Sequence, residues 1–225
     1  MKEWNFKQEF PQVPACTPMP PASLARESKK ANGSYKEADV IEQLQLDFHK
    51  KCYLCEMDEL QSVEVEHLRP HSGDKALKFA WDNLFYSCAH CNSVKNQKKY
   101  NGAILDCCKA DPEAVLEQTF TGGHVFVKPL ARTHEVQMTA CLLTECFELT
   151  NTGIREIECH TRINALNVTM NTLYKTLQKH RRQPTSRSLH TLQGMLNRTY
   201  KFAGFTRAYV RSHLEDYPDL EEYIQ

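Results

Sequence analysis

Two identical cysteine pairs, Cys52-Tyr-Leu-Cys55 and Cys88-Ala-His-Cys91, flank the stretch of sequence that decides the fold. Each Cys-x-x-Cys turn brings two sulfurs to one point, and two such turns can close a tetrahedral site around Zn²⁺. Because four thiolates leave no open coordination position, we expect this zinc to be structural. The 32 residues between the pairs exceed what a simple loop needs, which indicates that a further structural unit is mounted there.

The segment between the pairs predicts a β-hairpin. Residues 62–68 (Ser-Val-Glu-Val-Glu-His-Leu) alternate in polarity, are partly β-branched and end close to Pro70, as a strand does. The run from Cys91 to Tyr100 has no helix breaker before Gly102 and predicts a short helix. The expected order is therefore strand, strand, helix.

Groups suited to phosphodiester hydrolysis lie in the same stretch. Glu66 and His67 end the strand, Asn83 follows sixteen residues after His67, and Asn92 directly follows the last cysteine. Hydrolysis needs a base that takes a proton from water and a cation that neutralises charge on the phosphate. A neutral imidazole can be the base. Mg²⁺ or Mn²⁺ prefers oxygen ligands and keeps several waters, so one carboxylate and one amide suffice to hold it.

In this order of residues the chain resembles the HNH endonuclease family, whose ββα-metal fold is often clamped by a four-cysteine zinc site. The resemblance covers residues 52–95: Cys-x-x-Cys, acid-His-x-x-Pro, Asn-Leu and Cys-x-x-Cys-Asn-x-x-Lys. It implies that His67 is the general base, that Asn83 orients it, and that Glu66 and Asn92 hold the catalytic Mg²⁺ or Mn²⁺. Many members carry Asp in place of Glu66 and His in place of Asn92, but Glu and Asn also offer oxygen donors.

Two further points concern the site. Neighbours on a strand point to opposite faces, so a plain strand does not explain how Glu66 and His67 would serve one metal site. His71, just after Pro70, is either a phosphate contact or a surface histidine. The other candidates for nucleic-acid contact are Lys95, Arg181 and Arg182.

The charge of the chain is unevenly distributed. Lys and Arg together number 28, as do Asp and Glu, so the formal net charge is zero. From Arg155 to Arg211, however, the segment carries a net charge of +9, whereas the last fourteen residues carry five acids and no Lys or Arg. Such asymmetry predicts either a phosphate-binding face beside a short acidic terminus or simply two solvated helix faces.

The flanking segments predict a mainly helical chain. Residues 1–34 contain five prolines and then Asn32-Gly-Ser34, which indicates an extended arm, and Ser34 is expected to cap a helix that leads to Cys52. Asp111-Pro112 predicts the start of a short helix to Glu117, and residues 120–127 predict a small hairpin.

The C-terminal half predicts two long helices. Apolar residues recur at helical spacing from Cys159 to Leu177 and again from Leu189 to Tyr209. Joined through residues 182–186, they are expected to form an antiparallel hairpin. The predicted fold is mainly α with a small β part: a proline-rich arm (1–34), the ββα-metal core with its four-cysteine zinc (35–110) and a mostly helical region for binding a partner or nucleic acid (111–225).

Composition favours a soluble globular protein. Hydrophobic residues make up 41% and charged residues 25% of the 225, which is far from a disordered composition. No stretch approaches the roughly 18 to 20 apolar residues of a membrane span, and residues 1–10 lack the apolar core of a signal peptide. We therefore expect a cytoplasmic protein, in which the cysteine pairs bind metal rather than form disulfides.

Short matches in the core and in the segments that flank it resemble one branch of the family, the PtuB nucleases of Septu and some retron anti-phage systems. That branch implies a toxic nuclease directed by a partner ATPase, PtuA, and in retrons also by a reverse transcriptase with its DNA product. The matches are Pro20-Pro21-Ala-Ser-Leu24, Glu66-His67-Leu-Arg69-Pro70, Trp81-Asp82-Asn83-Leu84, Ile104-Leu105-Asp106 to Asp111-Pro112-Glu113, and Phe202-Ala-Gly204-Phe-Thr-Arg207.

Three hypotheses follow from the sequence. The first is a metal-dependent defence endonuclease acting on DNA, or on RNA such as tRNA. The second is a restriction-type HNH nuclease that works alone on DNA. The third is a zinc-organised interaction module without catalysis, which the presence of His67 together with Glu66 and Asn92 argues against.

Overall fold

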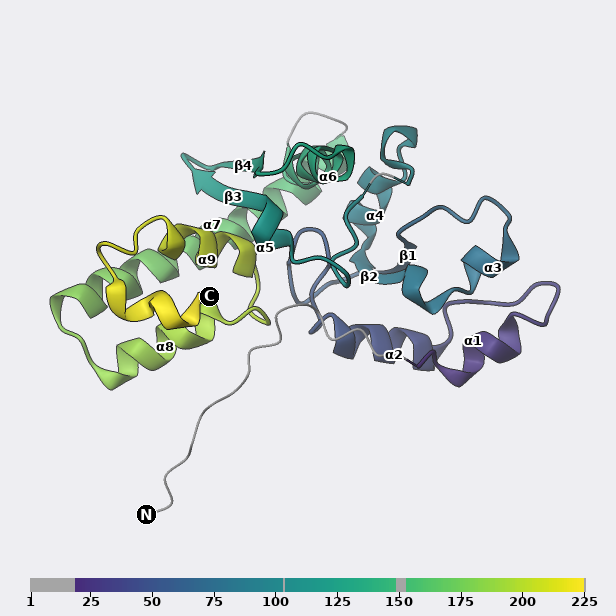
Figure 1. Cartoon of the computed structure of the whole chain (residues 1–225), viewed down its shortest axis with the longest axis horizontal. Helices are drawn as coiled ribbons and strands as arrows, with labels where there is room; N and C mark the ends of the chain where they lie inside the picture. The colour runs from purple at the N-terminus through teal and green to yellow at the C-terminus, as the bar shows by residue number, and fades with distance from the viewer. Residues whose placement is uncertain (1–18, 103, 149–152, 225) are drawn as a thin grey trace, which may run out of the picture.

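The structure is a computed structural model that describes residues 19–102, 104–148 and 153–224. Within these residues the chain is mainly helical with two small antiparallel sheets, as predicted (Figure 1). The helices are α1 (Ala22–Glu27), α2 (Ala38–Asp47), α3 (Lys75–Lys78), α4 (Ala89–Lys95), α5 (Pro112–Val115), α6 (His134–Glu145), α7 (Gly153–Arg182), α8 (Ser186–Leu196) and α9 (Ala203–Arg211). The strands are β1 (Val63–His67), β2 (Leu84–Cys88), β3 (Leu116–Thr121) and β4 (His124–Pro129), and three short 3₁₀ turns are η1 (Trp81–Asn83), η2 (Lys98–Tyr100) and η3 (Pro218–Tyr223).

The predicted order strand, strand, helix between and after the cysteine pairs is confirmed. Strand β1 pairs antiparallel with β2, so that His67 lies opposite Leu84. The chain passes from β2 directly into α4, where the Cys88 side chain caps the helix by accepting a hydrogen bond from the Cys91 amide. Helix α4 packs against both strands but ends at Lys95, and the predicted extension to Tyr100 is instead the separate turn η2.

Two predictions at the N-terminal side are wrong. Residues 22–27 form helix α1 rather than an extended arm. The prolines all precede this segment, so none of them interrupts the helix. Ser34 does not cap the next helix, since α2 begins at Ala38 after Glu37, and the Ser34 hydroxyl accepts a hydrogen bond from the Lys36 amide instead. The rest of the predicted arm, residues 1–18, lies outside the described residues.

The middle of the chain agrees in part with the prediction: the short helix starts as expected but ends at Val115, and Glu117 belongs to strand β3. Asp111 caps the short helix α5 by accepting a hydrogen bond from the Glu113 amide at 3.0 Å, with Pro112 in the first helical position. The following hairpin is longer than predicted: β3 and β4 pair from Leu116 opposite Pro129 to Thr121 opposite His124.

The predicted helical hairpin is present, but its second arm is broken. Helix α7 packs against α8, and the chain then leaves the helix at residues 197–202 before α9 begins. The buried Lys51 ammonium donates hydrogen bonds to the carbonyl oxygens of Arg198 and Tyr200, at 2.7 and 2.9 Å. A continuous helix would use these oxygens in its own hydrogen bonds, so the contact with Lys51 accounts for the break. Phe202, at a φ of 54°, then starts α9.

One cluster of buried side chains extends from Leu24 to Ile224 and joins the two halves of the chain. The first cysteine turn contacts the C-terminal helices directly, because the Glu56 carboxylate accepts a hydrogen bond from the Gly204 amide at 2.7 Å. Gly204 leaves room for this contact, since a Cβ there would lie 3.0 Å from the Glu56 carboxylate and 2.3 Å from the Gln118 side-chain amide. None of the helices in the described part of the chain, the 30-residue α7 included, is apolar enough to cross a membrane.

Candidate metal centre and candidate active site

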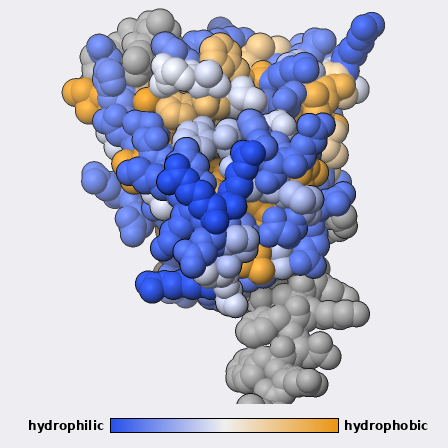
Figure 2. Space-filling view, turned by 90° about the vertical axis from the view of Figure 1, so that its left-hand side faces the viewer, coloured by the Kyte–Doolittle hydropathy of each residue, from blue (hydrophilic) through white to orange (hydrophobic). Residues whose placement is uncertain are grey.

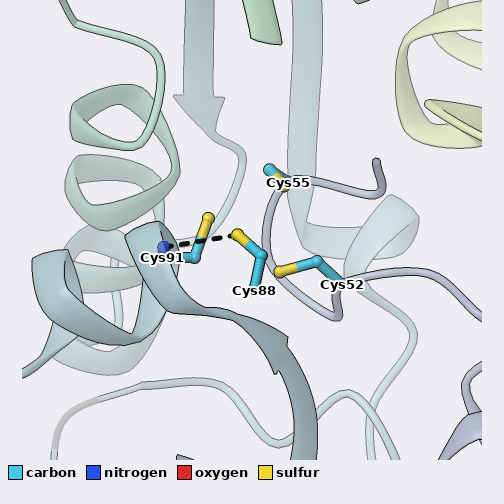
Figure 3. Close-up of side chains that lie close together, drawn as sticks. All are labelled: Cys52, Cys55, Cys88 and Cys91. Carbon is cyan, nitrogen blue, oxygen red and sulfur yellow. Dashed lines mark hydrogen bonds between the residues drawn. The ribbon is translucent and has the colours of Figure 1, made fainter. Parts of the chain in front are cut away.

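The four cysteines of the two pairs meet at one buried point (Figure 3). Cys52 and Cys55 lie in the turn after α2, Cys88 ends β2, and Cys91 lies in the first turn of α4. Their sulfur atoms all lie within 4.8 Å of one another, and each cysteine is buried. Four convergent thiols without an oxygen donor are the ligand set of a structural Zn²⁺. The predicted zinc residues are therefore brought together in an arrangement that fits the ion.

The pKa values of Cys88 and Cys52 are both lowered in this cluster. Hydrogen bonds from the thiols of Cys52, Cys55 and Cys91, together with the charge of Arg162, hold the pKa of Cys88 well below its usual range. The pKa values of Cys55 and Cys91 are raised, because each donates to a neighbouring sulfur or is buried. Binding of Zn²⁺ would ionise all four thiols, since thiolates are its ligands.

Arg162 is a buried cation against this cluster that the sequence analysis did not single out. Its Nη2 atom lies 3.0 Å from Cys88 Sγ, and its side chain, on α7, is almost wholly buried. The Nη1 atom donates to the Glu158 carbonyl and carboxylate, whereas Nε is buried and has no partner within the described residues. The sequence does contain a sign of its burial, because Arg162 stands between Cys159 and Leu166 at helical spacing, on the buried side of the helix.

His67 ends β1 with its imidazole half-buried. Its Nε2 atom lies 3.1 Å from the Lys78 carbonyl oxygen. A carbonyl can only accept, so Nε2 carries the proton and Nδ1 carries the lone pair of the neutral ring. Burial lowers the pKa of His67 and outweighs the opposing effect of this hydrogen bond, while the nearby His71 lowers it further. The geometry thus favours a neutral imidazole with a basic Nδ1 at neutral pH.

Asn83 acts on His67 only through the backbone. It is fully buried, and its amide accepts a hydrogen bond from the Arg69 amide and donates to the carbonyls of Arg69 and Leu77. These contacts fix both ends of the loop from residue 69 to 78, which supplies the Lys78 carbonyl bound by His67. Asn83 therefore holds the loop that carries the carbonyl contacted by His67, and the orienting role that the resemblance implies for it stays a prediction.

Glu66 faces away from His67, as expected for strand neighbours. Its carboxylate is buried and accepts from Lys95 Nζ at 2.5 Å through one oxygen and from the Tyr53 hydroxyl at 2.6 Å through the other. Burial raises the pKa of Glu66, and Lys95 and Tyr53 oppose that rise by stabilising the ionised form. Lys95 also donates to the His67 carbonyl at 2.8 Å. It is thus an internal cation rather than a surface contact for nucleic acid.

The residues implied as ligands of a catalytic Mg²⁺ or Mn²⁺ do not fit such an ion in this arrangement. Both oxygens of Glu66 are engaged, and a buried ammonium already neutralises the carboxylate. Asn92 is half-buried, with its side-chain oxygen 3.5 Å from the Asn96 amide. Among the residues that the structure describes, the four cysteines are the only cluster of His, Cys, Asp and Glu suited to a metal.

Two aromatic side chains cover the His67 ring. Tyr35 meets it edge-on with the ring centroids 4.5 Å apart, and His71 lies at 4.8 Å. His71 thus lies beside the candidate base. Lys36 and Lys78 lie near the Tyr35 ring, at 5.7 and 5.8 Å from its centroid. Because Lys36 is paired with Glu64, the surroundings of His67 are aromatic with the Lys78 ammonium nearby.

The basic segment does not form one continuous face, because several of its arginines are bound internally. Arg198 pairs with Asp111, and Arg198, Arg207 and Arg211 all contact the Glu113 carboxylate. Arg181 and Arg182 are both exposed, and Arg181 pairs with Asp216 of the acidic terminus at 3.0 Å.

A serine, a histidine and an aspartate also meet near the end of α7, but their geometry is structural. His180 contacts the Ser188 hydroxyl through Nδ1 at 2.8 Å and Asp219 through Nε2 at 2.7 Å. Ser188 is buried and forms the capping box of α8 with Thr185, so its hydroxyl is committed to the helix terminus. These contacts fasten the acidic terminus to the helical hairpin.

Comparisons with known proteins do not name a family. No family model matches this sequence, and no curated protein is significantly similar to it. Fold and site together define a mainly helical protein organised by a buried four-cysteine cluster, with a strand, strand, helix unit that carries a half-buried histidine. Any statement of function therefore rests on the residues and contacts described above.

Proposed function

We propose that this chain is an HNH-type endonuclease that hydrolyses phosphodiester bonds of DNA, or of RNA such as tRNA, with His67 as the general base. The observation that carries the proposal is the hydrogen bond from His67 Nε2 to the Lys78 carbonyl, at 3.1 Å. It fixes the tautomer that leaves Nδ1 basic. A neutral histidine with a fixed ring is the group that hydrolysis needs to take a proton from water.

The surrounding residues support this role for His67. The antiparallel partner β2 and the cysteine cluster hold β1 in place, and Asn83 fixes the loop that orients the ring. Rigid placement of the base matters because small displacements of a catalytic group cost much of its effect. The Lys78 ammonium lies 5.8 Å from the centroid of the Tyr35 ring, which packs on His67, and its positive charge suits an anionic phosphate, whereas Lys36 is paired with Glu64.

The family resemblance implies a catalytic divalent ion, but the observed contacts of the implied ligands do not support one. Glu66 and Asn92 would be its ligands, but the pair of Glu66 with Lys95 leaves no open carboxylate. We assign no step of hydrolysis to such an ion. The steps assigned to the chain itself are proton removal by His67 and its positioning by Asn83.

The biological setting is proposed from the resemblance to the PtuB nucleases alone. In that setting the chain is the toxic effector of a Septu or retron anti-phage system, held and directed by a PtuA-like ATPase. In a retron the reverse transcriptase and its DNA product are further partners. A stand-alone restriction-type nuclease is the alternative, and it differs by cleaving DNA without the ATPase.

Cleavage assays separate these options. Purified protein is incubated with plasmid DNA or total tRNA, with Mg²⁺, Mn²⁺ or EDTA, and with or without a PtuA-like ATPase. We expect wild-type protein to cleave one substrate and His67→Ala to leave it intact, while His124→Ala, an exposed histidine on β4, cleaves normally. Equal cleavage by wild type and His67→Ala would exclude His67 as the base.

One observation favours a second function, a zinc-organised interaction module without catalysis. The carboxylate that the resemblance assigns to a catalytic ion is neutralised by Lys95 inside the protein. This function predicts no cleavage by wild-type protein under any of the conditions above, with the fold intact and zinc bound. It also predicts that His67→Ala leaves partner binding and anti-phage protection unchanged.

A further inference from the structure

We propose that Lys175, Lys179 and Arg182 of α7 and Arg187 of α8 form a site for the phosphate backbone of nucleic acid, which we call the tip face. This inference rests on the proposed nuclease function and extends it to the way in which substrate is held. It concerns binding at the turn between α7 and α8, outside the candidate active site around His67.

The tip face is set by helical spacing. Lys175, Lys179 and Arg182 stand at positions i, i+4 and i+7 and are exposed, whereas Leu177 and His180 on the same helix are buried. Positions with this spacing lie on one side of a helix. Arg187 is also exposed and lies in the first turn of α8, which packs against α7. The four cations thus belong to one end of the helical hairpin.

These cations differ from the other arginines and lysines of the basic segment because no carboxylate neutralises them. None of the four has an acidic partner within residues 19–102, 104–148 and 153–224. The sequence from Cys159 to Leu214 contains no Asp or Glu at all. The adjacent Arg181 is different, since Asp216 lies 3.0 Å from it. Asp216 of the acidic terminus therefore neutralises Arg181, whereas Arg182 can still bind phosphate.

The surface around the tip face favours a phosphate backbone over a protein. Figure 2 views the end of the molecule where α7 meets α8 and shows a largely hydrophilic surface. Of the exposed large apolar side chains of the described residues, Val168 lies on the same side of α7 but two turns before Lys175, away from the turn between α7 and α8. Protein interfaces usually have an apolar or aromatic centre, whereas none of these exposed apolar side chains lies between the four cations along the chain. Nucleic-acid backbones need only cations and polar groups.

The dimensions agree with a run of phosphates. From Lys175 to Arg182 the helix rises about 10 Å, which is close to three base-pair steps of about 3.4 Å along one strand. The C-terminus of α7 and the N-terminus of α8 meet at this point, so their opposite dipole charges largely offset each other. The positive potential of the tip face is then due to its side chains.

Salt dependence of binding tests the tip face without reference to cleavage. Fluorescence anisotropy measures binding of full-length His67→Ala protein to a labelled 20-base-pair DNA duplex and to a labelled tRNA over a series of salt concentrations. Each phosphate contact contributes about 0.9 to the slope of log K against log[salt] on duplex DNA. Replacement of all four cations by Gln should reduce the slope by about 3.6 on the duplex, and Arg182→Gln alone by about 0.9.

Two controls use cations that the proposal excludes. Arg181→Gln removes the same charge one residue away, but from a side chain already paired with Asp216, and should change the slope less than Arg182→Gln. Replacement of Lys29, Lys75 and Lys98, which are exposed in the N-terminal half, should leave it unchanged.

Three results would overturn the tip face. The first is no measurable binding of either probe, and the second is an unchanged salt slope in the fourfold variant. The third is a salt slope that the control variants change as much as the tip-face variants do. If the fourfold variant kept its binding to nucleic acid and lost only its binding to a PtuA-like ATPase, the tip face would be a protein interface. Wild-type protein that binds through the tip face but never cleaves would contradict the proposed function alone.

Discussion

Arg162 Nη2 lies 3.0 Å from Cys88 Sγ and joins the longest helix of the protein to its cysteine cluster. Zn²⁺ with four thiolates carries a net charge of −2, and burying that charge is unfavourable unless cations compensate it. A buried guanidinium is one such cation. The contact gives a physical reason why α7 packs against the cysteine cluster rather than folding apart from it.

Replacement of Arg162 by Met should weaken zinc binding and lower the melting temperature. Methionine keeps much of the buried volume but removes the charge beside Cys88, and loss of one member of a buried charged pair costs about 3–5 kcal/mol. Zinc transfer to a colorimetric chelator and thermal unfolding measure the two effects. Arg155→Met is the matched control, because Arg155 is more exposed and pairs with Glu145. Zinc transfer at the wild-type rate in Arg162→Met would show that the contact is incidental.

Cys88→Ser should lose zinc and unfold the surrounding strand and helix. Cys88 is at once a candidate zinc ligand and the cap of α4, and structural zinc contributes directly to folding. Metal analysis and circular dichroism report the two losses. Cys141→Ser, at an exposed cysteine on α6, should change neither quantity. A folded Cys88→Ser protein without zinc would contradict the structural role of the site.

The pair of Glu66 with Lys95 should be strongly coupled. Removing the ammonium by Lys95→Met leaves a buried carboxylate, which costs about 3–5 kcal/mol of unfolding free energy. Removing both charges with Glu66→Gln and Lys95→Met should restore much of that loss. Urea unfolding of the two single variants and the double variant gives the coupling energy. Additive losses would mean that the two side chains do not form the buried pair seen here.

Activity should persist to lower pH than an ordinary histidine base would allow. Burial and the neighbouring His71 lower the pKa of His67 below its usual value of about 6.5. The neutral, basic form is therefore present at and above neutral pH, and is lost only as the pH falls through the lowered value. Histidine resonances followed by NMR, assigned with His67→Gln, measure this pKa without an activity assay. A midpoint above 6.5 would contradict the burial of the ring.

The local fold could largely be predicted from sequence where a few residues suffice to define it. Two Cys-x-x-Cys turns imply convergence at one metal, and the alternation of residues 62–68 implies a strand. The Asp111-Pro112 pair likewise marks the start of α5 correctly. These signals act over a few residues, so no distant contact is needed to interpret them.

The errors arise where distant residues decide the structure. The break between α8 and α9 depends on Lys51, which lies far away in the sequence and binds the carbonyls of Arg198 and Tyr200. The pairing of Lys95 with Glu66 and that of Arg162 with Cys88 are also long-range. A basic segment in the sequence likewise gives no sign that Glu113 neutralises several of its arginines.

The most direct test of the account is chemical rescue of His67. Single-turnover cleavage by His67→Ala is measured with and without added imidazole, on the substrate that wild-type protein cleaves, beside the same titration of wild type. The account predicts that cleavage is lost in His67→Ala and partly restored by imidazole in its neutral form, with the wild-type rate unaffected. Wild-type cleavage rates in His67→Ala without imidazole would contradict it.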